Sequence, residues 1–400
     1  MNQQASSTAD VVVVGLGAFG SAVLYQLAKR GIRAIGIDRF TPPHTMGSSH
    51  GETRITRLAV GEGDAYAPLV RRSHALWREI EQHGGGNLFQ ETGGLIMAPR
   101  DSSARHHGRE NFVRRSIAIA ARTGIAHEVL DAGEIAARYP QFQLRGDELG
   151  YFEPTAGVLS PERCIETQLR LAVQFGAVVR TGERVVAIDQ HGGTVRVTTE
   201  RGMLEASRCV VTAGPWLAGL LPAFRPLARV YRQVLHWFAP LDPAKFAPGR
   251  FPVFIWMHGD QEEDYFYGFP IAEGGIDLKV ATETYAREVD PDDVDRTVSA
   301  DLPAAMYAQH VAGRLRTVTG RATRSAACLY TVTPDAGFIV DTLPDQDRVL
   351  AVSACSGHGF KHSAAVGEAI AQVVTSGASV IDLSPFGMGR FGGVGLPSQT

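Results

Sequence analysis

Residues 11–38 contain a strand, a glycine-rich turn, a helix and a second strand in direct succession, and this run constrains the fold more than any other part of the chain. Residues 11–14 are four valines, which is typical of a strand buried on both faces. Gly15-Leu16-Gly17-Ala18-Phe19-Gly20 follows at once, and apolar residues then recur at helical spacing at Val23, Leu24, Leu27 and Ala28. A second strand at residues 33–37 ends at Asp38. This pattern predicts a β-α-β unit in an open α/β sheet.

The glycines of this unit predict a dinucleotide site. Gly15 would make the tight turn, Gly17 would let a pyrophosphate approach the backbone, and Gly20 would let helix and strand pack closely. The helix N-terminus offers free N–H groups and a positive dipole end to phosphates. Asp38 stands where a carboxylate accepts hydrogen bonds from the adenosine ribose. It would repel the 2′-phosphate of NADP, so NAD and FAD remain as the two alternatives.

Composition narrows the class of protein. The chain of 400 residues is 44% hydrophobic and 20% charged, with a net charge of −3, as in a soluble globular protein of more than one domain. Nucleic-acid binding would need a concentrated basic face, and membrane spanning a run of about 20 apolar residues. The polar N-terminus lacks the pattern of a secretory signal. We therefore expect a cytoplasmic protein with neither a nucleic-acid nor a membrane partner.

The cysteines predict neither a disulfide framework nor a metal site. They lie far apart in the chain, without CxxC pairing. We expect reduced thiols at Cys164, Cys209, Cys328 and Cys355.

The pattern of apolar and aromatic residues changes in the middle of the chain. A helix begins at Ser160-Pro161, and alternating segments at 184–188, 194–199 and 204–211 predict a small β-meander. From about residue 224 to residue 323 the strands are rich in aromatic residues, and residues 283–300 form one long polar stretch. This predicts a second domain built on a sheet. A last apolar helix after Gly359 would return to the first domain.

Three further blocks resemble a known family. Residues 41–57 include Thr41-Pro42-Pro43-His44 and Gly47-Ser48-Ser49-His50-Gly51-Glu52-Thr53-Arg54-Ile55-Thr56-Arg57. Ala327-Cys328-Leu329-Tyr330-Thr331 is followed by Asp335 and by Phe338-Ile339-Val340-Asp341, and the third block is Ser356-Gly357-His358-Gly359-Phe360-Lys361. With the first glycine motif, these blocks resemble, in order, those of the monomeric sarcosine oxidase and N-methyltryptophan oxidase family. Its members are FAD-dependent amine oxidoreductases of the D-amino-acid-oxidase superfamily.

The resemblance implies a fold of the α/β (α+β) class. A Rossmann-like FAD-binding domain would be assembled from residues 1–85, 147–222 and 324–390. A mainly antiparallel catalytic domain, from residues 86–146 and 223–323, would cap the flavin. Residues 391–400 would form a C-terminal tail, and the protein would be a monomer.

The resemblance also implies the residues that contact FAD. Cys328 matches the cysteine that this family bonds to the flavin 8-methyl carbon, so we expect covalent FAD. The alternative is a buried structural thiol. The expected FAD-binding residues are Gly15, Gly17, Ala18, Phe19, Gly20, Asp38, Arg39, His44, Ser48, Ser49, Thr53, Val185, Cys328, Gly357, His358, Gly359 and Lys361.

Four residues match the family's catalytic and substrate-binding cations. Lys279 matches the lysine beneath the flavin near N5, where a fixed charge stabilises superoxide, and Arg54 would neighbour it. The alternative for Lys279 is a surface lysine on a strand edge. Arg57 and Lys361 match the pair that grips the substrate carboxylate. Alternatively, Arg57 forms a surface salt bridge with Glu62 or Asp64.

Tyrosines and histidines complete the expected site. Tyr267 and Tyr330 would line the substrate pocket, or else belong to the packed aromatic core. His50 and His358 are candidates for a general base. Because positive charges in the site can themselves lower the pKa of a bound amine, we expect both histidines to serve the flavin environment instead.

The chain departs from the family pattern at three places. Glu283, four residues after Lys279, stands where sarcosine-oxidising members carry histidine. Ala336-Gly337 follows Asp335 in place of Glu-His. His362 replaces phenylalanine after Lys361. These departures put sarcosine itself in question as the substrate.

The reaction implied by the resemblance is oxidation of a secondary amine. A hydride would pass from the carbon beside the nitrogen to flavin N5, the imine would hydrolyse, and O₂ would take the electrons to give H₂O₂. An N-methyl amino acid such as sarcosine or N-methyltryptophan would yield the amino acid and formaldehyde. Alternatives are a larger N-alkyl amino acid, a cyclic imino acid such as pipecolate, an amine dehydrogenase that uses another acceptor, and a flavoprotein without turnover.

Overall fold

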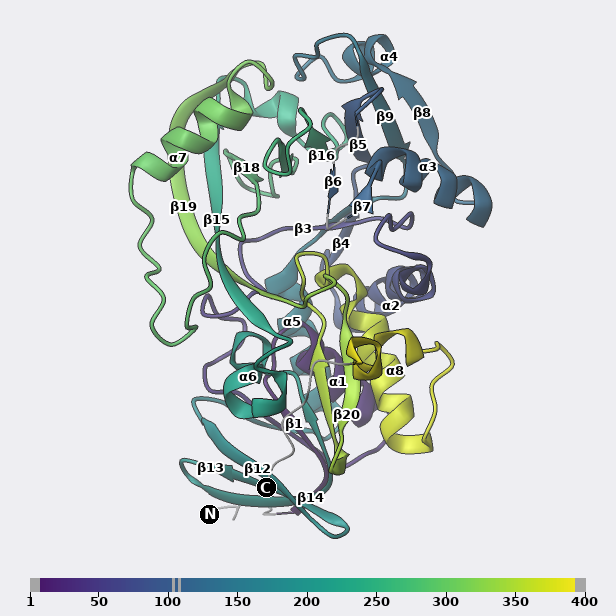
Figure 1. Ribbon diagram of the computed structural model, residues 1–400, viewed down its shortest axis with the longest axis vertical. Coiled ribbons are helices and arrows are strands. Elements are labelled where there is room, and N and C mark those ends of the chain that lie inside the picture. The colour runs from purple at the N-terminus through teal and green to yellow at the C-terminus, as the bar shows by residue number, and fades with distance from the viewer. Residues whose placement is uncertain (1–7, 103–104, 107–108, 393–400) are drawn as a thin grey trace.

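The computed structural model describes residues 8–102, 105–106 and 109–392. Two large sheets lie one above the other, the first in the lower half of Figure 1 and the second in the upper half. Residues 1–7 and most of the tail expected at 391–400 lie outside the described residues.

The first sheet has a parallel centre. Neighbouring strands run in the order β11 (Val178–Arg180), β2 (Ala34–Ile37), β1 (Thr8–Val14), β14 (Gly202–Val211) and β21 (Gln346–Ser353). The predicted meander is present as β12 (Val185–His191) and β13 (Thr194–Thr199), which pair antiparallel beside β14, and β20 (Ile339–Leu343) pairs antiparallel with β21.

The four valines of β1 are all buried because both faces of the sheet are covered. Val11 and Val13 pack in the core under the helices, whereas Val12 and Val14 pack in the core under the meander. Successive side chains of a strand point to opposite faces, so a strand covered twice must be apolar at every position. The covering helices are α1 (Ala18–Lys29), α2 (Ala67–Gly84), α5 (Pro161–Gln174) and α8 (Ser363–Ser376) on one face, with α6 (Leu217–Leu220) on the other.

The second sheet is antiparallel except where β16 pairs with β5. Its order is β19 (Val318–Val332), β15 (Arg229–Pro240), β18 (Leu278–Ala281), β17 (Tyr265–Gly268), β16 (Val253–Met257), β5 (Gly94–Pro99), β9 (Glu148–Glu153) and β8 (Glu128–Asp131). The aromatic-rich strands expected from the sequence lie in this sheet, and their side chains, among them Phe238, Phe254, Trp256 and Phe266, pack in a core of their own. The expected fold class is therefore confirmed.

The two halves are joined by long strands and by the polar stretch. Strands β15 and β19 form a ribbon that descends from the second sheet towards the first (Figure 1). Strands β9 and β19 lie in the second sheet. The expected boundaries, however, place β9 and most of β19 in the FAD-binding domain, within segments 147–222 and 324–390. The division into domains remains a prediction. Residues 282–300 contain no helix or strand, and Asp292 within them contacts Arg39 and Trp216 beside the first sheet.

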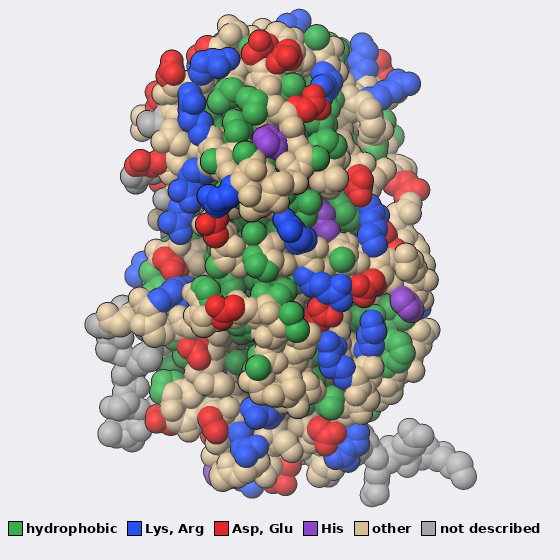
Figure 2. Space-filling model, turned by 90° about the vertical axis from the view of Figure 1, so that its right-hand side faces the viewer, with side chains coloured by type: hydrophobic (Ala, Val, Ile, Leu, Met, Phe, Trp, Pro, Cys, Tyr) green, Lys and Arg blue, Asp and Glu red, His purple; other side chains and the backbone are tan. Residues whose placement is uncertain are grey.

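Shorter elements fill the space between the sheets. β3 (Arg54–Thr56), β10 (Gly157–Leu159) and β4 (Phe89–Glu91) form a three-stranded sheet, and β6 (Arg105–His106) pairs with β7 (Arg109–Glu110). The remaining α-helices are α3 (Phe112–Thr123), α4 (Ala132–Arg138) and α7 (Asp301–Met306). No helix in the described part of the chain is long and apolar enough to cross a bilayer. On the face in Figure 2, acidic and basic side chains are interspersed.

Candidate functional site

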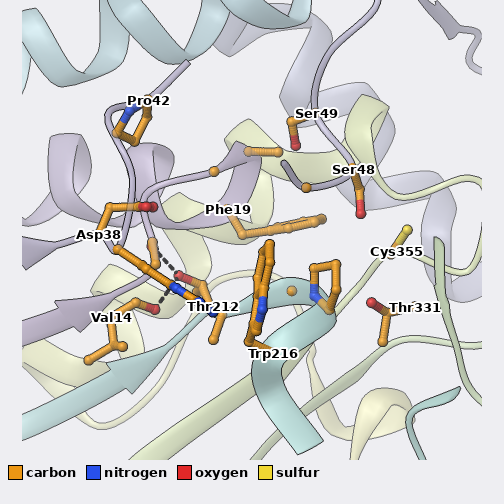
Figure 3. A pocket seen from close by; sticks show the side chains of 18 of the residues that line it. Val14, Phe19, Asp38, Pro42, Ser48, Ser49, Thr212, Trp216, Thr331 and Cys355 are labelled. Atoms are coloured by element: carbon orange, nitrogen blue, oxygen red, sulfur yellow. Dashed lines mark hydrogen bonds between the residues drawn. The ribbon is translucent and has the colours of Figure 1, made fainter. Parts of the chain in front are cut away.

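The larger of two adjoining cavities starts at the glycine-rich turn after β1. It has a volume of about 320 Å³ and extends from Asp38 at the end of β2 to Cys355 after β21 (Figure 3). Its wall comes from the N-terminus of α1, the loop 39–54, the start of β12 and residues 212–220. Segments far apart in the chain therefore build one elongated site.

The glycines at the start of this cavity have separate structural roles. Gly15 has φ +87°, in the left-handed region, and Thr212 Oγ1 donates to its carbonyl oxygen at 2.6 Å. A Cβ on Gly20 would lie 1.7 Å from the same oxygen, so only glycine permits this packing. A Cβ on Gly17 would contact, among described residues, only Ser49 Oγ at 3.8 Å. Gly17 thus leaves the backbone open towards the cavity, as predicted.

Asp38 lies at the other side of this turn. Its carboxylate accepts hydrogen bonds from the backbone N–H of Leu16 at 2.7 Å and of Phe40 at 2.7 Å, and His44 Nε2 lies 3.6 Å away. Arg39 pairs with Asp292, which also accepts from Trp216 Nε1 at 2.7 Å. Asp292 belongs to the polar stretch 282–300, which therefore contributes to the wall of this cavity.

The far end of the large cavity is positively charged. Arg54 Nη2 donates to the carbonyl oxygen of Ser48 at 2.6 Å, and Nη1 to that of Thr53 at 2.8 Å. Both Arg54 and Tyr330 line the large cavity and the small one, so the two cavities adjoin. The small cavity has a volume of about 70 Å³. It is lined by Thr53, Arg54, Ile55, Arg57, Glu62, Ile255, Tyr267, Phe269, Lys279, Glu283, Tyr330, Gly357, His358, Phe360 and Lys361.

Lys279 is buried on β18, not placed on a strand edge. Its Nζ donates to the carbonyl oxygens of Gly51 at 2.7 Å and Thr53 at 2.9 Å, and to Thr53 Oγ1 at 3.0 Å. The same ammonium lies 4.6 Å from the ring centre of Phe269. Burial, and then the nearby Arg54, lower the pKa of Lys279 well below its ordinary value. Lys279 thus brings a second basic side chain, fixed by three hydrogen bonds, next to Arg54.

Arg57 and Lys361 meet in the small cavity around a third residue, Glu62. Glu62 Oε1 lies 3.2 Å from Arg57 Nη2 and 3.2 Å from Lys361 Nζ, and all three side chains are buried. The salt bridge of Arg57 with Glu62 therefore exists but is not on the surface, and Asp64 pairs with Arg122 instead. Arg57 Nε and Nη1 have no hydrogen-bond partner among the described residues. The group thus carries one net positive formal charge and unused donors.

Two tyrosines face each other across the small cavity. The hydroxyl groups of Tyr267 and Tyr330 lie 3.3 Å apart, and burial raises the pKa of both phenols. The hydroxyls therefore stay protonated at neutral pH and offer hydrogen bonds within the cavity. Both residues line this cavity, and their role in binding a substrate remains a prediction.

A comparison with known proteins decides the family. The family described as "FAD dependent oxidoreductase" matches residues 10–373. The chain belongs to this family. FAD is therefore its cofactor, and the family expected from the sequence is confirmed.

This FAD-dependent oxidoreductase has close relatives in sequence. It is 35% identical over 386 residues to the monomeric sarcosine oxidase of Bacillus sp. (strain NS-129), a match that covers 95% of this chain and 96% of that protein. It is 34% identical over 388 residues to the N-methyl-L-tryptophan oxidase of Yersinia pestis (strain Pestoides F), covering 96% and 99%.

Solved structures confirm the fold. NikD, described as an unusual amino acid oxidase essential for nikkomycin biosynthesis, superposes with a TM-score of 0.83 at 23% identity, covering 96% of this chain and 98% of that one. L-proline dehydrogenase from P. horikoshii gives 0.78 at 20% identity, covering 96% and 98%.

The large cavity of the FAD-dependent oxidoreductase fits its cofactor. The opening at Gly17 and the N-terminus of α1 suit the pyrophosphate, and Asp38 suits a ribose. Among the expected FAD-binding residues, those that line this cavity are Gly15, Gly17, Ala18, Phe19, Asp38, Arg39, His44, Ser48, Ser49, Val185, Gly357 and Gly359. Thr53, His358 and Lys361 line the small cavity instead.

Cys328 lies behind the wall of the FAD cavity. Its fully buried Sγ lies 3.7 Å from the carbonyl oxygen of Ser48 and 4.0 Å from Arg54 Nη2, two residues that line the cavity. Cys355 does line the cavity, is only half-buried, and is labelled beside Ser48 in Figure 3. No motif in the sequence points to Cys355, because the matched motif contains Cys328. The covalent link remains a prediction.

His50 and His362 are neutral at physiological pH. Burial, followed by the charges of Arg54 and Lys279, lowers the pKa of His50 to about 3. His362 is fully buried, and burial lowers its pKa well below the ordinary value. His358 Nε2 lies 2.9 Å from the carbonyl oxygen of Ala336, in the turn that departs from the family pattern. The structure therefore holds His50 as a neutral imidazole.

Several residues of the site escaped the sequence analysis. Glu162 Oε1 accepts from the backbone N–H groups of Gly51 at 2.6 Å and Glu52 at 3.1 Å, and so holds the loop that contacts Lys279. Thr212 fixes the glycine turn through its hydrogen bond to the Gly15 carbonyl oxygen, and Asp292 pairs with Arg39 in the wall of the large cavity. For Thr212 alone the sequence gives a local indication, because the break Thr212-Ala213-Gly214-Pro215 after a strand is typical of a backbone that passes close to a ligand, and these residues do line the large cavity.

Proposed function

We propose that this enzyme is an oxidase of a small N-methyl or N-alkyl amino acid, with O₂ as the electron acceptor. The observation that carries the proposal is the small cavity beside the FAD cavity, where Arg57 and Lys361 lie together with Lys279. The names of relatives at 34–35% identity, sarcosine oxidase and N-methyl-L-tryptophan oxidase, support the same substrate class. The term monomeric in the first name also supports a monomer, which light scattering would test.

Arg57 and Lys361 would bind the substrate carboxylate. Arg57 keeps two donors, Nε and Nη1, beyond those used by Glu62. Bound FAD would supply the redox chemistry, accepting a hydride from the carbon beside the substrate nitrogen and passing the electrons to O₂. The buried carboxylate contacts would fix the substrate's orientation at the wall shared by the two cavities.

Lys279 and Arg54 would provide positive charge where oxygen is reduced. Both line the small cavity, and Lys279 is held rigidly by three hydrogen bonds. A fixed cation in a site of low dielectric stabilises negative charge as it develops on O₂, because no solvent reorganisation is needed. This charge favours an oxidase over a dehydrogenase that uses a protein or quinone acceptor.

The size of the small cavity favours a small substrate. About 70 Å³ is below the usual range of about 300–1,000 Å³ for drug-sized ligands. A sarcosine-sized amino acid or a compact cyclic imino acid suits this volume better than N-methyltryptophan. The imine product would leave the cavity and hydrolyse to the amino acid and an aldehyde.

A panel of substrates tests the proposal. N-methyl amino acids of increasing side-chain size and cyclic imino acids are mixed with the enzyme without oxygen, and flavin bleaching is recorded. We expect rapid bleaching by small N-methyl amino acids, followed by stoichiometric H₂O₂ when air is admitted. Bleaching only by cyclic imino acids would show that the substrate is a cyclic imino acid. Bleaching without formation of H₂O₂ in air would show that the electron acceptor is not O₂.

A further inference from the structure

Glu162 is a carboxylate in the first turn of α5 that the reaction described above does not use. The side chain is half-buried and lies outside the described walls of both cavities. Its Oε1 accepts hydrogen bonds from the backbone N–H groups of Gly51 at 2.6 Å and Glu52 at 3.1 Å. These residues belong to the loop whose carbonyl oxygens bind Lys279. Glu162 therefore reaches the small cavity through the backbone of this loop.

The backbone of this loop is shaped to hold an anion. Gly51 and Glu52 both adopt left-handed conformations, with φ of +94° and +71°, which is uncommon for a residue that carries a Cβ. Their successive N–H groups converge on one oxygen atom, as in the backbone nests that bind anions. A Cβ on Gly51 would lie 2.5 Å from Leu235 Cδ1, so conformation and packing both favour glycine. The carboxylate of Glu162 fills this concavity from within the chain.

One peptide unit connects Glu162 to Lys279. Its carbonyl group, from Gly51, accepts a hydrogen bond from Lys279 Nζ at 2.7 Å, and its N–H group, from Glu52, donates to Glu162 Oε1 at 3.1 Å. The negative end of the peptide dipole thus faces the ammonium group, and the positive end faces the carboxylate. Both charges polarise the same dipole, and hydrogen bonds in such a chain strengthen one another where the dielectric is low. A negative charge on Glu162 therefore stabilises a positive charge on Lys279.

The other groups around Lys279 do not replace this carboxylate. Burial first, and then Arg54, lower the pKa of Lys279, whereas the charge of Glu162 raises it more than that of Glu52 does. Glu52 is also bound to Arg324 at 2.6 Å. The nearby titratable groups that are uncharged at neutral pH are His50 of the loop, Cys328 and Tyr330 of β19, and Tyr267 of β17. The other charged residues of the small cavity are Arg57, Glu62, Glu283 and Lys361.

We propose that Glu162 is a positioning residue for the reduction of O₂: through the peptide unit of Gly51 and Glu52 it fixes the ammonium group of Lys279 and keeps it protonated. This inference rests on the proposed function, in which a cation at Lys279 stabilises the negative charge that develops on oxygen. In Glu162→Gln the amide oxygen still accepts hydrogen bonds from both N–H groups. The substitution therefore removes the charge of Glu162 and retains the acceptor that holds the loop.

The proton on Lys279 can be followed directly, because the lysines of the chain are only Lys29, Lys245, Lys279 and Lys361. Lysine labelled with ¹³C at Cε is incorporated, and the Cε chemical shifts of the FAD-loaded enzyme are recorded against pH. The signal that Lys279→Met lacks belongs to Lys279. We expect Glu162→Gln to lower the Lys279 midpoint by about one pH unit, as for loss of one nearby opposite charge. Glu162→Asp should lower it less, because the charge remains.

A matched control lies one turn further along α5. Glu166 is exposed, and Glu166→Gln removes the same charge from the same helix, so the Lys279 midpoint should not move. An unchanged midpoint in Glu162→Gln, or an equal change in Glu166→Gln, overturns the proposal. The wild type gives a test that needs no variant, because the amide proton of Glu52 should shift at the same midpoint as Lys279. An amide signal that ignores this titration would also overturn the proposal.

The pH profile of reoxidation separates this inference from the proposed substrate. The FAD-loaded enzyme is reduced photochemically without any amine, and it is mixed with O₂ in a stopped-flow instrument at a series of pH values. The pH above which reoxidation slows should fall in Glu162→Gln by the same amount as the Lys279 midpoint. A lowered midpoint with an unchanged reoxidation profile would overturn the role of Glu162 in oxygen reduction. Absence of flavin bleaching by every N-alkyl amino acid would instead contradict the proposed substrate alone.

Discussion

The group of Arg57, Glu62 and Lys361 illustrates what burial does to single charges. Removing an ion from water costs several kcal/mol, and only close partners offset the cost. Burial lowers the pKa of Lys361 to about 8, although the nearby Glu62 opposes the shift. Lys361 therefore loses its proton at a much lower pH than an exposed lysine does, while Arg57 remains charged. A substrate carboxylate would meet two cations below that pH and one above it.

We expect acid ligands to bind more weakly as the pH rises through about 8. Deprotonation removes the Lys361 charge, and a hydrogen bond to a charged partner is worth about 1.5–3 kcal/mol. Titration of (methylthio)acetate across this pH range measures the effect. Lys361→Met should bind this acid weakly at every pH without the inflection, and should bind neutral analogues almost normally. An unchanged inflection in the variant would assign the titration to another group.

The two cysteines near the flavin end make the covalent link testable. We expect the yellow colour to remain with the wild-type polypeptide after acid precipitation and to be released from Cys328→Ala. Cys355→Ala is the matched control, because Cys355 lines the FAD cavity itself. Release from Cys355→Ala alone would transfer the link to that residue. Release from the wild type would mean that FAD is bound without a covalent bond.

Lys279 should matter to one half-reaction far more than to the other. In the proposed reaction its cation would stabilise negative charge on oxygen, whereas hydride transfer from the substrate would need no such charge. Loss of one preorganised electrostatic group typically costs about 10²–10³ in rate. We expect Lys279→Met to slow reoxidation by O₂ on that scale and to leave anaerobic flavin reduction much less affected. Stopped-flow measurement of both steps decides the matter, and equal slowing would contradict this role.

At the scale of elements, the unit β1–α1–β2 is where the sequence was most informative. Its sequence pattern is local. Residues 11–14 are all valine because both faces of the strand are covered, and glycines are needed where helix and strand pack closely and where a phosphate approaches the backbone. For the second sheet, the sequence predicted only that its strands are rich in aromatic residues. Its strand order could not be derived, because β5, β9 and β16 are far apart in the chain and their pairing leaves no local pattern.

Gly17 and Gly20, the second and third glycines of the motif, should respond differently to substitution by alanine. A Cβ on Gly20 would lie 1.7 Å from the Gly15 carbonyl oxygen, so Gly20→Ala forces the backbone apart. Overpacking of this kind costs about 1–3 kcal/mol. Gly17→Ala adds a methyl group that faces the cavity, so FAD affinity should fall while the stability of the apoprotein changes little. Thermal unfolding of both apoproteins and FAD titration would separate the two effects.

At the scale of the whole molecule, the site depends on contacts that no local pattern predicts. Glu62 and Lys361 are separated by 299 positions, and Cys328 and Gly47 by 281. The resemblance supplied Arg57, Lys279 and Lys361 as a group. Glu62 was expected only as a surface partner of Arg57, and Asp292 was not expected at all. Their roles become visible only when the fold brings distant segments together around two cavities.

Because the FAD cavity is built from segments spread along the whole chain, the cofactor should stabilise the molecule as a unit. Asp292, in the otherwise irregular residues 282–300, pairs with Arg39 and Trp216 in the wall of this cavity. In a cysteine variant that releases its FAD, free cofactor at about 100 times its dissociation constant should stabilise folding by about 2.7 kcal/mol. Thermal unfolding at increasing FAD concentration measures this gain. The same additions should slow proteolytic cleavage within residues 282–300, because the Asp292 contacts close that part of the wall. If FAD raised the unfolding temperature but did not slow cleavage within residues 282–300, this polar stretch would not be stabilised by the cofactor.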